Sequence, residues 1–409
     1  MSVAVPTIKV EIKFTGGPDW GDASLGAFVL GVSGLGDPSA TYTDVSSDVR
    51  SVGINRGKSR ELEEFRSGVC KVVLGNNSRQ YDPTYTSGPN YGNIKPGRMM
   101  RVYATHPTTA VTTLIYKGVI RAWDYGYQPA GVNKGDATAT VLASDILYDA
   151  GQAEFSTTTS GGLSGQQVIS VLDEINLTDR SIDTGIHSMQ ATTYANTNVL
   201  SALRTIAYSE GVDVATVYGS KSNQLIYEDA ISLETKANVG TFGPSALPIT
   251  KVDLTYESDL VKNSIAFTRT GGAQQTDTDT TSITDYGTRS LSRSGLVNAT
   301  DGDVSGLASL ALDQFKDAEL RIRKIQLAPQ ANATLMTKVL AMEIRDLLTV
   351  EFSPPGTGTI SQDHFVIGID MQFRPQKFIA GLTLNSETGK VGGNFILGYA
   401  TLGTSKIGF

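Results

Sequence analysis

The stretch TIKVEIKF at residues 7–14 places four apolar side chains at alternate positions: Ile8, Val10, Ile12 and Phe14. A period of two puts such residues on one face of a β-strand, so this stretch predicts a strand with one buried face. Similar short runs follow at residues 51–57, 70–76, 100–105, 113–125 and 136–148. Clusters of Gly, Pro and Asn separate them, which is typical of a barrel or sandwich. Residues 1–152 are therefore expected to form an N-terminal β-barrel domain.

The periodicity changes between residues 153 and 250. Ser164 and Gln167 form a predicted capping box, and apolar residues at helical spacing follow it. A second helix is expected from Asn198 to a C-cap at Gly211, followed by a hairpin. Residues 153–250 are therefore expected to form a small α/β domain.

Strands return from residue 251, together with one predicted helix that begins at Asp301 or Asp303. Residues 251–388 are expected to form a second β-barrel domain with this helix, and the glycine-rich residues 389–409 an extended C-terminal arm. Residues 271–285 are almost entirely polar, so they are expected to be mobile unless a partner orders them. The predicted fold is mainly β, with a small α/β domain between two β-barrels.

Composition excludes several classes of protein. The chain has 409 residues, a net charge of −7 and a pI of about 5.1, which argues against charge-driven binding of nucleic acid. Only 18% of residues are charged, as expected where other subunits cover part of the surface. No apolar run is long enough to span a membrane, and the first residues resemble a strand rather than a signal peptide. Synthesis and folding in a cytoplasm are expected.

Few residues favour catalysis or metal binding. Cys70 is the single cysteine and is expected to be a small buried side chain, and His106, His187 and His364 do not have metal-ligand spacing. The chain contains neither a Gly-x-Ser-x-Gly elbow nor a nucleotide-binding glycine pattern. No catalytic residue, metal or cofactor is expected, although a spatial Ser-His-Asp triad and a glycosidase-type carboxylate pair stay open.

Two groups of charged residues have simpler interpretations. The aspartates of the polar loop and of the following helix lack a calcium-loop pattern, and we expect solvated or capping roles for Asp277, Asp279, Asp285, Asp301 and Asp303. The mixed charges between Arg56 and Arg66, which include Lys58, Arg60, Glu61, Glu63 and Glu64, indicate a charged surface or a subunit contact.

Residues 42–104 carry an ordered set of elements: Asp-Val with Asp-Val-Arg, Arg-Gly then Arg-Glu-Leu, a strand ending in Asn, Tyr-Asp-Pro, and Gly-Asn-Ile-Lys-Pro. In order and spacing they resemble the minor tail proteins of long-tailed bacteriophages that infect actinobacteria. The region from Tyr256 on, with VKNSIAFTRTGG, YGTRSLS and EIRDLLTVEF, is similar to the closing domain of tail or baseplate hub proteins.

The resemblance implies two related β-barrel domains flanking the α/β domain, and three copies assembled as a ring. It implies a structural, non-enzymatic component of the virion tail tip, the central hub ring below the tail tube. Its expected partners are further copies of itself, distal tail and tail-tube proteins, the tape-measure protein and other tail-tip proteins. The alternative within this class is the distal tail adaptor ring. A cell-wall hydrolase or a carbohydrate-binding module, with Tyr81, Tyr85 and Tyr91 as candidate aromatics, are further alternatives.

A repeated phrase suggests where subunits meet. GAFVLGVSGLG at residues 26–36 and GNFILGYATLG at residues 393–403 are identical at six of eleven positions. If the two barrels are equivalent, as the resemblance implies, the apolar side chains of both phrases are candidate subunit contacts: Phe28, Leu30, Leu35, Phe395, Ile396, Leu397, Tyr399 and Leu402. The alternative is a shared strand-turn phrase with no role beyond packing.

Overall fold

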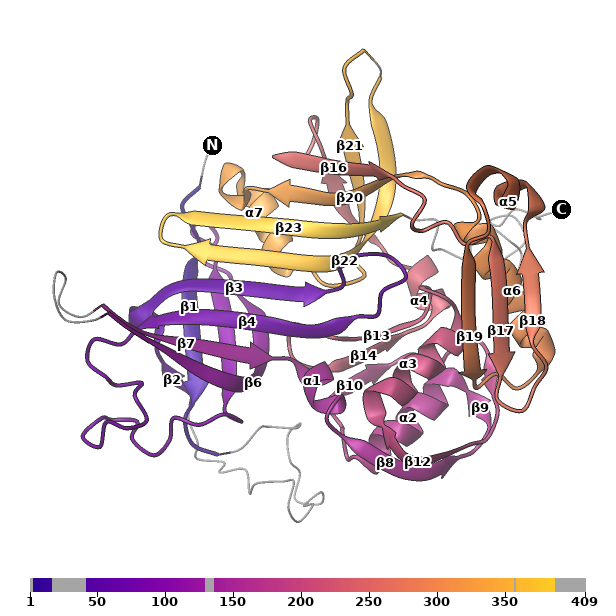
Figure 1. The fold of residues 1–409 in the computed structure, drawn as a ribbon. Coiled ribbons are helices and arrows are strands. Elements are labelled where there is room, and N and C mark those ends of the chain that lie inside the picture. Colours follow the sequence, from indigo (N-terminus) through magenta and orange to yellow (C-terminus); the bar gives the residue numbers. More distant parts are fainter. Residues whose placement is uncertain (1–2, 17–41, 129–135, 357, 387–409) are drawn as a thin grey trace.

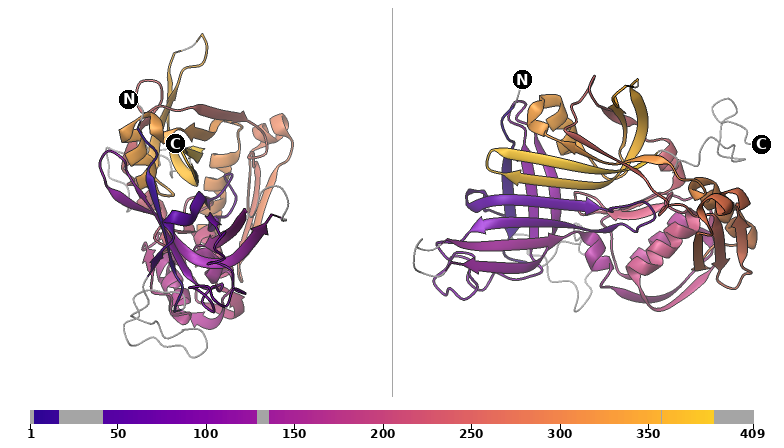
Figure 2. Two further views of the ribbon diagram at one scale, coloured as in Figure 1. Left: turned by 90° about the vertical axis from the view of Figure 1, so that its left-hand side faces the viewer. Right: turned by 45° about the horizontal axis from the view of Figure 1, so that its top comes forward.

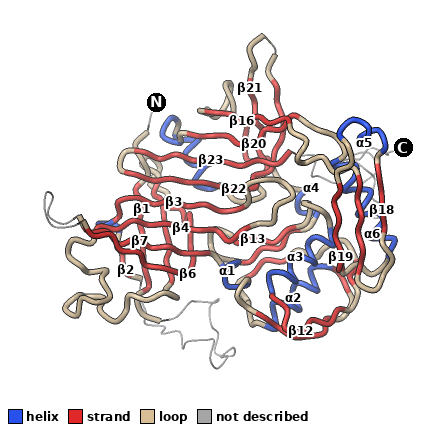
Figure 3. The backbone as a smooth tube through the Cα atoms, in the orientation of Figure 1, coloured by secondary structure: helices blue, strands red, loops and turns tan. Residues whose placement is uncertain are grey.

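Strands make up most of the protein, and its helices gather mainly at one side (Figure 3). The computed structural model describes residues 3–16, 42–128, 136–356 and 358–386. The repeated phrases at 26–36 and 393–403, and with them all eight candidate contact residues, lie outside these ranges. Their proposed role therefore stays a prediction.

One thirteen-stranded sheet contains strands from both ends of the chain. Its N-terminal half consists of β1 (Thr7–Lys13), β2 (Thr43–Asp44), β3 (Val49–Gly57), β4 (Arg66–Gly75), β5 (Met99–Thr105), β6 (Thr112–Tyr127) and β7 (Ala137–Ser144). Its C-terminal half consists of β15 (Asn238–Phe242), β16 (Lys251–Tyr256), β20 (Leu320–Leu327), β21 (Leu347–Phe352), β22 (Ile360–Arg374) and β23 (Lys377–Ser386). β3 pairs antiparallel with β22 and joins the halves edge to edge (Figure 1).

Alternating burial explains these strands. In β4, Cys70, Val72 and Leu74 are fully buried, whereas Val69 and Lys71, on either side of Cys70, are exposed. The apolar face of the sheet belongs to a core that extends into the middle of the chain. The burial predicted for Cys70 is confirmed.

The two halves repeat one strand order. Without the two-residue β2, the N-terminal order is β1-β5-β6-β7-β4-β3, and the C-terminal order is β15-β21-β22-β23-β20-β16. Numbered along the chain, both orders read first, fourth, fifth, sixth, third, second. The one difference in direction is that β15 runs parallel to β21, whereas β1 runs antiparallel to β5. The halves are thus related in topology.

The described strands do not close into the two barrels expected from the sequence. Within the described ranges, the sheet is an open path from β16 to β2, with β15 and β21 as a branch from β22. The physical reason is the pairing of β22 with β3, because hydrogen bonds at this edge connect the halves to each other. The mainly β composition itself is as predicted.

The middle of the chain mixes helices and strands. Its helices are α1 (Ile146–Ala150), α2 (Ser164–Glu174), α3 (Val199–Glu210) and α4 (Ala230–Glu234). Its strands are β8 (Glu154–Thr159), β9 (Gly162–Leu163), β10 (Arg180–Ile182), β11 (Ser188–Met189), β12 (Thr192–Asn198), β13 (Thr216–Gly219) and β14 (Leu225–Glu228). β10 lies parallel to β14, as in α/β units. Figure 2 shows this region beside one end of the large sheet.

A separate small unit lies between β16 and β20. It contains β17 (Ser264–Arg269), β18 (Gln275–Thr278), α5 (Thr280–Tyr286), β19 (Ser290–Leu296) and α6 (Asp301–Phe315). Ile265, Phe267 and Phe315 belong to a second hydrophobic core formed between these strands and α6. The remaining elements are η1 (Ser46–Asp48), η2 (Pro329–Ala331) and α7 (Ala333–Ala341). Thr300, rather than an aspartate, is the N-cap of α6, and Asp303 completes its capping box.

The polar segment 271–285, expected to be mobile, instead contains β18 and most of α5. Asn263 is fully buried, and its amide donates to Ser282 Oγ at 3.1 Å and to the Gly287 carbonyl at 2.9 Å. Asp279 caps α5 by accepting from the Ser282 amide at 2.9 Å. Long-range polar contacts therefore order a segment that has few apolar side chains of its own.

Candidate functional site

The junction between the two halves is built from closely packed backbone. Gly57 in β3 stands opposite Gly368 in β22, and the ladder continues to Val52 opposite Phe373. Gly57 has φ +99°, and a Cβ there would lie 2.2 Å from the Ile367 carbonyl oxygen. A Cβ at Gly368 would lie 2.6 Å from the Lys58 carbonyl oxygen. Glycine is required at both positions because the backbones of β3 and β22 approach too closely for a side chain to fit between them.

Buried charges connect this junction to the middle of the chain. Arg56, 3% exposed, donates to Glu343 and to the carbonyl oxygen of Gly219, 2.8 Å away. Lys58, 4% exposed, pairs with Asp213. One short stretch of β3 and its following loop thus reaches both the middle region and the C-terminal half.

Two more ion pairs cross the same region. Arg321 on β20 pairs with Glu61, and both side chains are buried. Arg345 is only 1% exposed, and its Nε lies 3.5 Å from a Glu228 carboxylate oxygen. Arg345 also donates to the carbonyl oxygen of Val214 at 2.5 Å. Such pairs are costly to break because the remaining charge stays buried without a partner.

These contacts correct the interpretation of the charge-rich stretch between Arg56 and Arg66 for its buried members, whereas Glu64 and Arg66 lie on the surface as expected. Arg56, Lys58 and Glu61 are buried within one subunit and do not form a charged surface or a subunit contact. Their partners are 287, 155 and 260 positions away in the chain. The buried charges orient the two halves and the middle region relative to one another.

The sheet face opposite the core carries small and polar side chains. They are partly or fully exposed and lie on both sides of the junction: Ser51, Gly53, Asn55, Lys71, Thr140, Gln326, Asp370, Gln372 and Thr383. Gly53 stands between Gln372 and Lys71, and Asn55 stands opposite Asp370. We call this surface the polar face. It extends across both halves of the sheet, and partly exposed Val73 and Leu142 lie on the same face.

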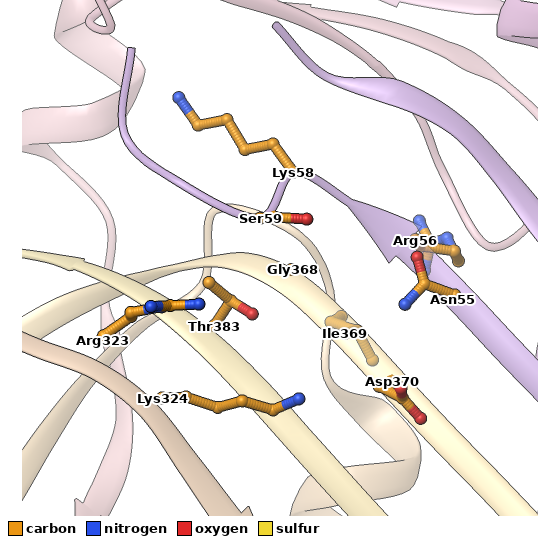
Figure 4. A pocket seen from close by; sticks show the side chains of 10 residues that line it. All are labelled: Asn55, Arg56, Lys58, Ser59, Arg323, Lys324, Gly368, Ile369, Asp370 and Thr383. Carbon is orange, nitrogen blue, oxygen red and sulfur yellow. The ribbon is translucent and has the colours of Figure 1, made fainter. Parts of the chain in front are cut away.

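A pocket of about 180 Å³ opens at the junction on this face. Figure 4 shows that Lys324 extends toward Asp370, whereas Lys58 extends away from both. Lys58 and Arg56 are neutralised by partners outside the pocket. The lining contains neither a histidine nor a cysteine, and its one carboxylate belongs to Asp370. The pocket therefore provides a polar depression rather than a set of groups for acid-base or nucleophilic chemistry.

One of the three candidate aromatics of a sugar-binding surface is buried, whereas Tyr85 and Tyr91 are partly or fully exposed. Tyr81 is 2% exposed, stacks with Phe14 and Trp123, and donates its hydroxyl to Asp48 at 2.7 Å. Burial is the main cause that raises the pKa of this hydroxyl. Asp82, the next residue of the Tyr-Asp-Pro element, accepts from the Thr84 amide at 2.8 Å. The quoted motif thus has a structural role in holding loops onto the N-terminal half.

The histidines and aspartates also have structural positions. His106 is buried, its Nδ1 accepts from the Thr108 amide at 3.1 Å, and its Nε2 lies 3.0 Å from the Ala333 carbonyl oxygen. The structural role predicted for His106 is therefore confirmed. Asp301 pairs with Arg269 at 2.5 Å, and Asp277 accepts from Ser309 Oγ at 2.6 Å.

Over the described residues, no group of three or more His, Cys, Asp or Glu side chains is arranged to hold a metal ion. None of the helices in the described ranges is both long and apolar enough to cross a membrane.

The residues that matter most at the junction were missed by sequence reasoning. Asp213, Glu228, Glu343 and Arg345 lie in unremarkable local patterns, and no spacing rule connects them. One available signal was the glycine of Asn55-Arg56-Gly57, which marks a close backbone approach within a predicted strand.

No protein-family model matches the chain, and no curated protein matches it in sequence. Solved structures do match it. The 43 kDa tail protein of prophage MuSo2 from Shewanella oneidensis matches with a TM-score of 0.55 and 11% identity, over 94% of this chain and 98% of that one. The tail protein from Neisseria meningitidis MC58 matches with a TM-score of 0.56 and 11% identity, over 95% and 99%. Over nearly its whole length, this chain has the fold of these two tail proteins.

Proposed function

We propose that this protein is a structural component of a bacteriophage tail tip, where three copies form the hub ring below the tail tube. The observation that carries the proposal is the likeness in fold, over nearly the full length of each chain, to two tail proteins. The repeated strand order supports the ring, because three copies would present six related halves to a six-fold tube. The relation to phages of actinobacteria is proposed from residues 42–104 alone.

The role is proposed to be non-enzymatic. The buried charged groups at the junction are engaged in ion pairs that hold the subunit together, and neither histidine nor cysteine lines the junction pocket. Residues 1–152, 153–250, 251–388 and 389–409 are proposed as the structural divisions, with β15 of the second division pairing into the large sheet. The partners are proposed to be the tail-tube, distal tail, tape-measure and other tail-tip proteins, after synthesis in the bacterial host.

The repeated phrases are proposed to contact neighbouring subunits or tail proteins through Phe28 and Phe395 and the apolar residues that follow them. They occupy different places in the repeated strand order, since residues 26–36 follow the first strand of one half and residues 393–403 follow the last strand of the other. Deleting residues 393–409 should leave a folded subunit and impair tail assembly. Unimpaired assembly would remove the anchoring role.

The experiment for the ring is a mass measurement of the native assembly, together with images of tails labelled on this protein. Three copies at the tip are expected. Six copies would instead favour the distal adaptor ring. Protein that remains a single subunit at high concentration, and is not found on tails, would contradict both assignments.

A further inference from the structure

The repeated strand order can be aligned residue by residue. Val119 of β6 pairs with Met99, the first residue of β5, and Phe365 of β22 pairs with Leu347, the first residue of β21. Two residues later each strand has a bulge against its other neighbour, between Ile120 and Ala122 in β6 and between Val366 and Gly368 in β22. Both landmarks give the same alignment, in which residues 122–127 of β6 correspond to residues 368–373 of β22.

The alignment continues across the sheet to β3 and β16. Leu142 of β7 faces Ala122 and Thr383 of β23 faces Gly368, so these two residues correspond. On their other sides they face lysines, Lys71 and Lys324. The lysines in turn face Gly53 of β3 and Asp253 of β16. Residues 51–53 of β3 therefore correspond to residues 251–253 of β16. The β16–β20 register shifts after Asp253, and the correspondence continues along β16 itself to Leu254 and Thr255.

The corresponding strands differ in their partners. Residues 368–373 of β22 pair with β3, whereas residues 122–127 of β6 have no strand partner on that side within the described part of the chain. β3 lies between β4 and β22, whereas β16 is the end of the sheet and pairs with β20 alone among the described strands. Figure 1 shows β16 near the top of the sheet and β6 near its bottom, with the six intervening strands of the sheet between them. The two unpaired edges are thus the counterparts of the two that meet at the junction.

Burial follows the same pattern. Phe373 is 4% exposed at the junction, whereas its counterpart Tyr127 is 55% exposed. Ile54 is 2% exposed at the junction, whereas its counterpart Leu254 is 43% exposed. Unpaired strand edges with exposed apolar side chains readily take up a further strand. Among the described strands, neither edge therefore has the neighbour that covers its counterpart at the internal junction.

We propose that β6 of one subunit pairs antiparallel with β16 of a second copy of this chain, in the register of the internal β22–β3 junction. Tyr127 then lies opposite Val252, Gly126 opposite Asp253, and Tyr125 opposite Leu254. The occupant is a second copy because each subunit carries both complementary edges, and each edge is six residues long. A contact between two different surfaces repeats from copy to copy, so it generates a ring if the rotation closes.

Strand directions agree with this pairing. The path β16-β20-β23-β22-β3-β4-β7-β6 contains eight strands, and all neighbours in it are antiparallel. β6 therefore runs opposite to β16, and the alternation continues into the next copy. The ladder rests on the proposed self-association into a ring, and it specifies which edges make the contact.

The first test is cross-linking of the full chain with a short bifunctional thiol reagent. The variant combines Tyr127→Cys with Val252→Cys, which the proposed register places directly opposite each other in two copies. The control combines Tyr127→Cys with Tyr256→Cys, which lie four residues out of register, about 13 Å along the strand. Tyr256 is 67% exposed, so random collisions between subunits would cross-link the control variant more readily. Cross-linking of the first variant alone would therefore be strong support for the register. Cys70 is fully buried and should not react.

The expected result is a shift of the first variant, but not of the control, to about two and three times the chain mass. Equal cross-linking of both variants, or no cross-linking in protein that is a ring by mass, would overturn the ladder and leave the ring. A wild-type chain that never self-associates would overturn the ring itself. The two failures are therefore distinguishable.

Tyr127 donates its hydroxyl to Asp82 of its own subunit at 3.2 Å, so a second variant leaves Tyr127 unchanged. Leu254→Arg places a charge on the edge of β16, where the side chain is already 43% exposed in the single subunit. It should convert rings to single subunits whose unfolding curve is unchanged. Leu310→Arg, on α6 and 39% exposed, is the matched control and should leave the ring intact. Rings that persist in Leu254→Arg would contradict the proposal.

Discussion

Lys58 and Asp213 form an ion pair in which both charged side chains are almost completely buried, 1% and 7% exposed. Asp213 also accepts from the Asn385 amide at 3.3 Å, so one carboxylate contacts all three regions of the chain. This arrangement makes the junction sensitive to the loss of a single charge.

Replacing Asp213 with Asn should lower the free energy of unfolding by about 3 kcal/mol, because Lys58 stays buried without its counter-charge. The control is Asp136→Asn, which breaks the surface pair with Arg50, whose side chains are 38% and 45% exposed. That change should cost less than about 1 kcal/mol. Urea unfolding measures the loss of unfolding free energy in both variants. Equal losses would contradict a structural role for the buried pair.

Gly57→Ala should be strongly destabilising, by about 2–4 kcal/mol, because it combines a positive φ with a clash against the backbone of β22. Gly53 provides a control in the same strand, since a Cβ there would meet no atom within 4 Å. Gly53→Ala should stay within about 1 kcal/mol of the wild type. Thermal unfolding that fails to separate the two variants would exclude a close approach at Gly57.

Asp145 should give the unfolding free energy a defined pH dependence. Its carboxylate is buried and accepts from the Gly68 amide at 2.7 Å, and burial raises the pKa of Asp145 to about 6. The unfolded chain has a pKa near 3.9 for this group, so the folded state binds more protons between about pH 4 and 6. The contribution of Asp145 therefore decreases as the pH rises through this window, by about 3 kcal/mol in total.

The measurement for Asp145 compares wild type with Asp145→Asn at pH 4 and pH 7. The free energy of unfolding of the wild type, relative to the variant, should be higher at pH 4 than at pH 7. If the difference in unfolding free energy between wild type and variant is the same at both pH values, or larger at pH 7, the pKa of Asp145 is not raised in the folded protein. The absolute cost of the lost hydrogen bond cancels in this comparison.

Asn263→Ala should release the segment that contains β18 and α5, because the amide of Asn263 is its main buried polar contact. Hydrogen exchange at residues 279–287 should become much faster, while β3 and β22 stay protected. Thr284→Ala, on the exposed side of α5, is the control and should leave exchange nearly unchanged. Fast exchange of this segment already in the wild type would instead support its predicted mobility.

Local patterns predicted the elements whose partners lie nearby. The alternation of Val10 and Ile12 predicted β1, and Asn198 and Gly211 cap α3 as expected. The box predicted for α2 was shifted by one residue, because Gln166 rather than Gln167 accepts from the Leu163 amide, at 3.2 Å. These signals depend on neighbours within a few positions of the chain.

The features that organise the molecule depend on distant partners. Arg56 resembles a surface residue in sequence because its partner Glu343 is 287 positions away. The pairing of Gly57 with Gly368 that replaces two barrels by one sheet is likewise invisible to any local window. The repeat of the two halves shows in strand order and bulges, where backbone geometry matters, rather than in shared residues.

The alternating directions of the eight strands have a consequence for copy number. Because a subunit begins and ends its path with strands of opposite direction, a ring of any number of copies closes without a seam between parallel neighbours. Hydrogen-bond pattern alone therefore does not select three. The number of copies then depends on the curvature of the sheet, and β-bulges such as those of β6 and β22 bend strands. In the proposed ring, the curvature at these two bulges therefore determines the width of the opening that the copies enclose.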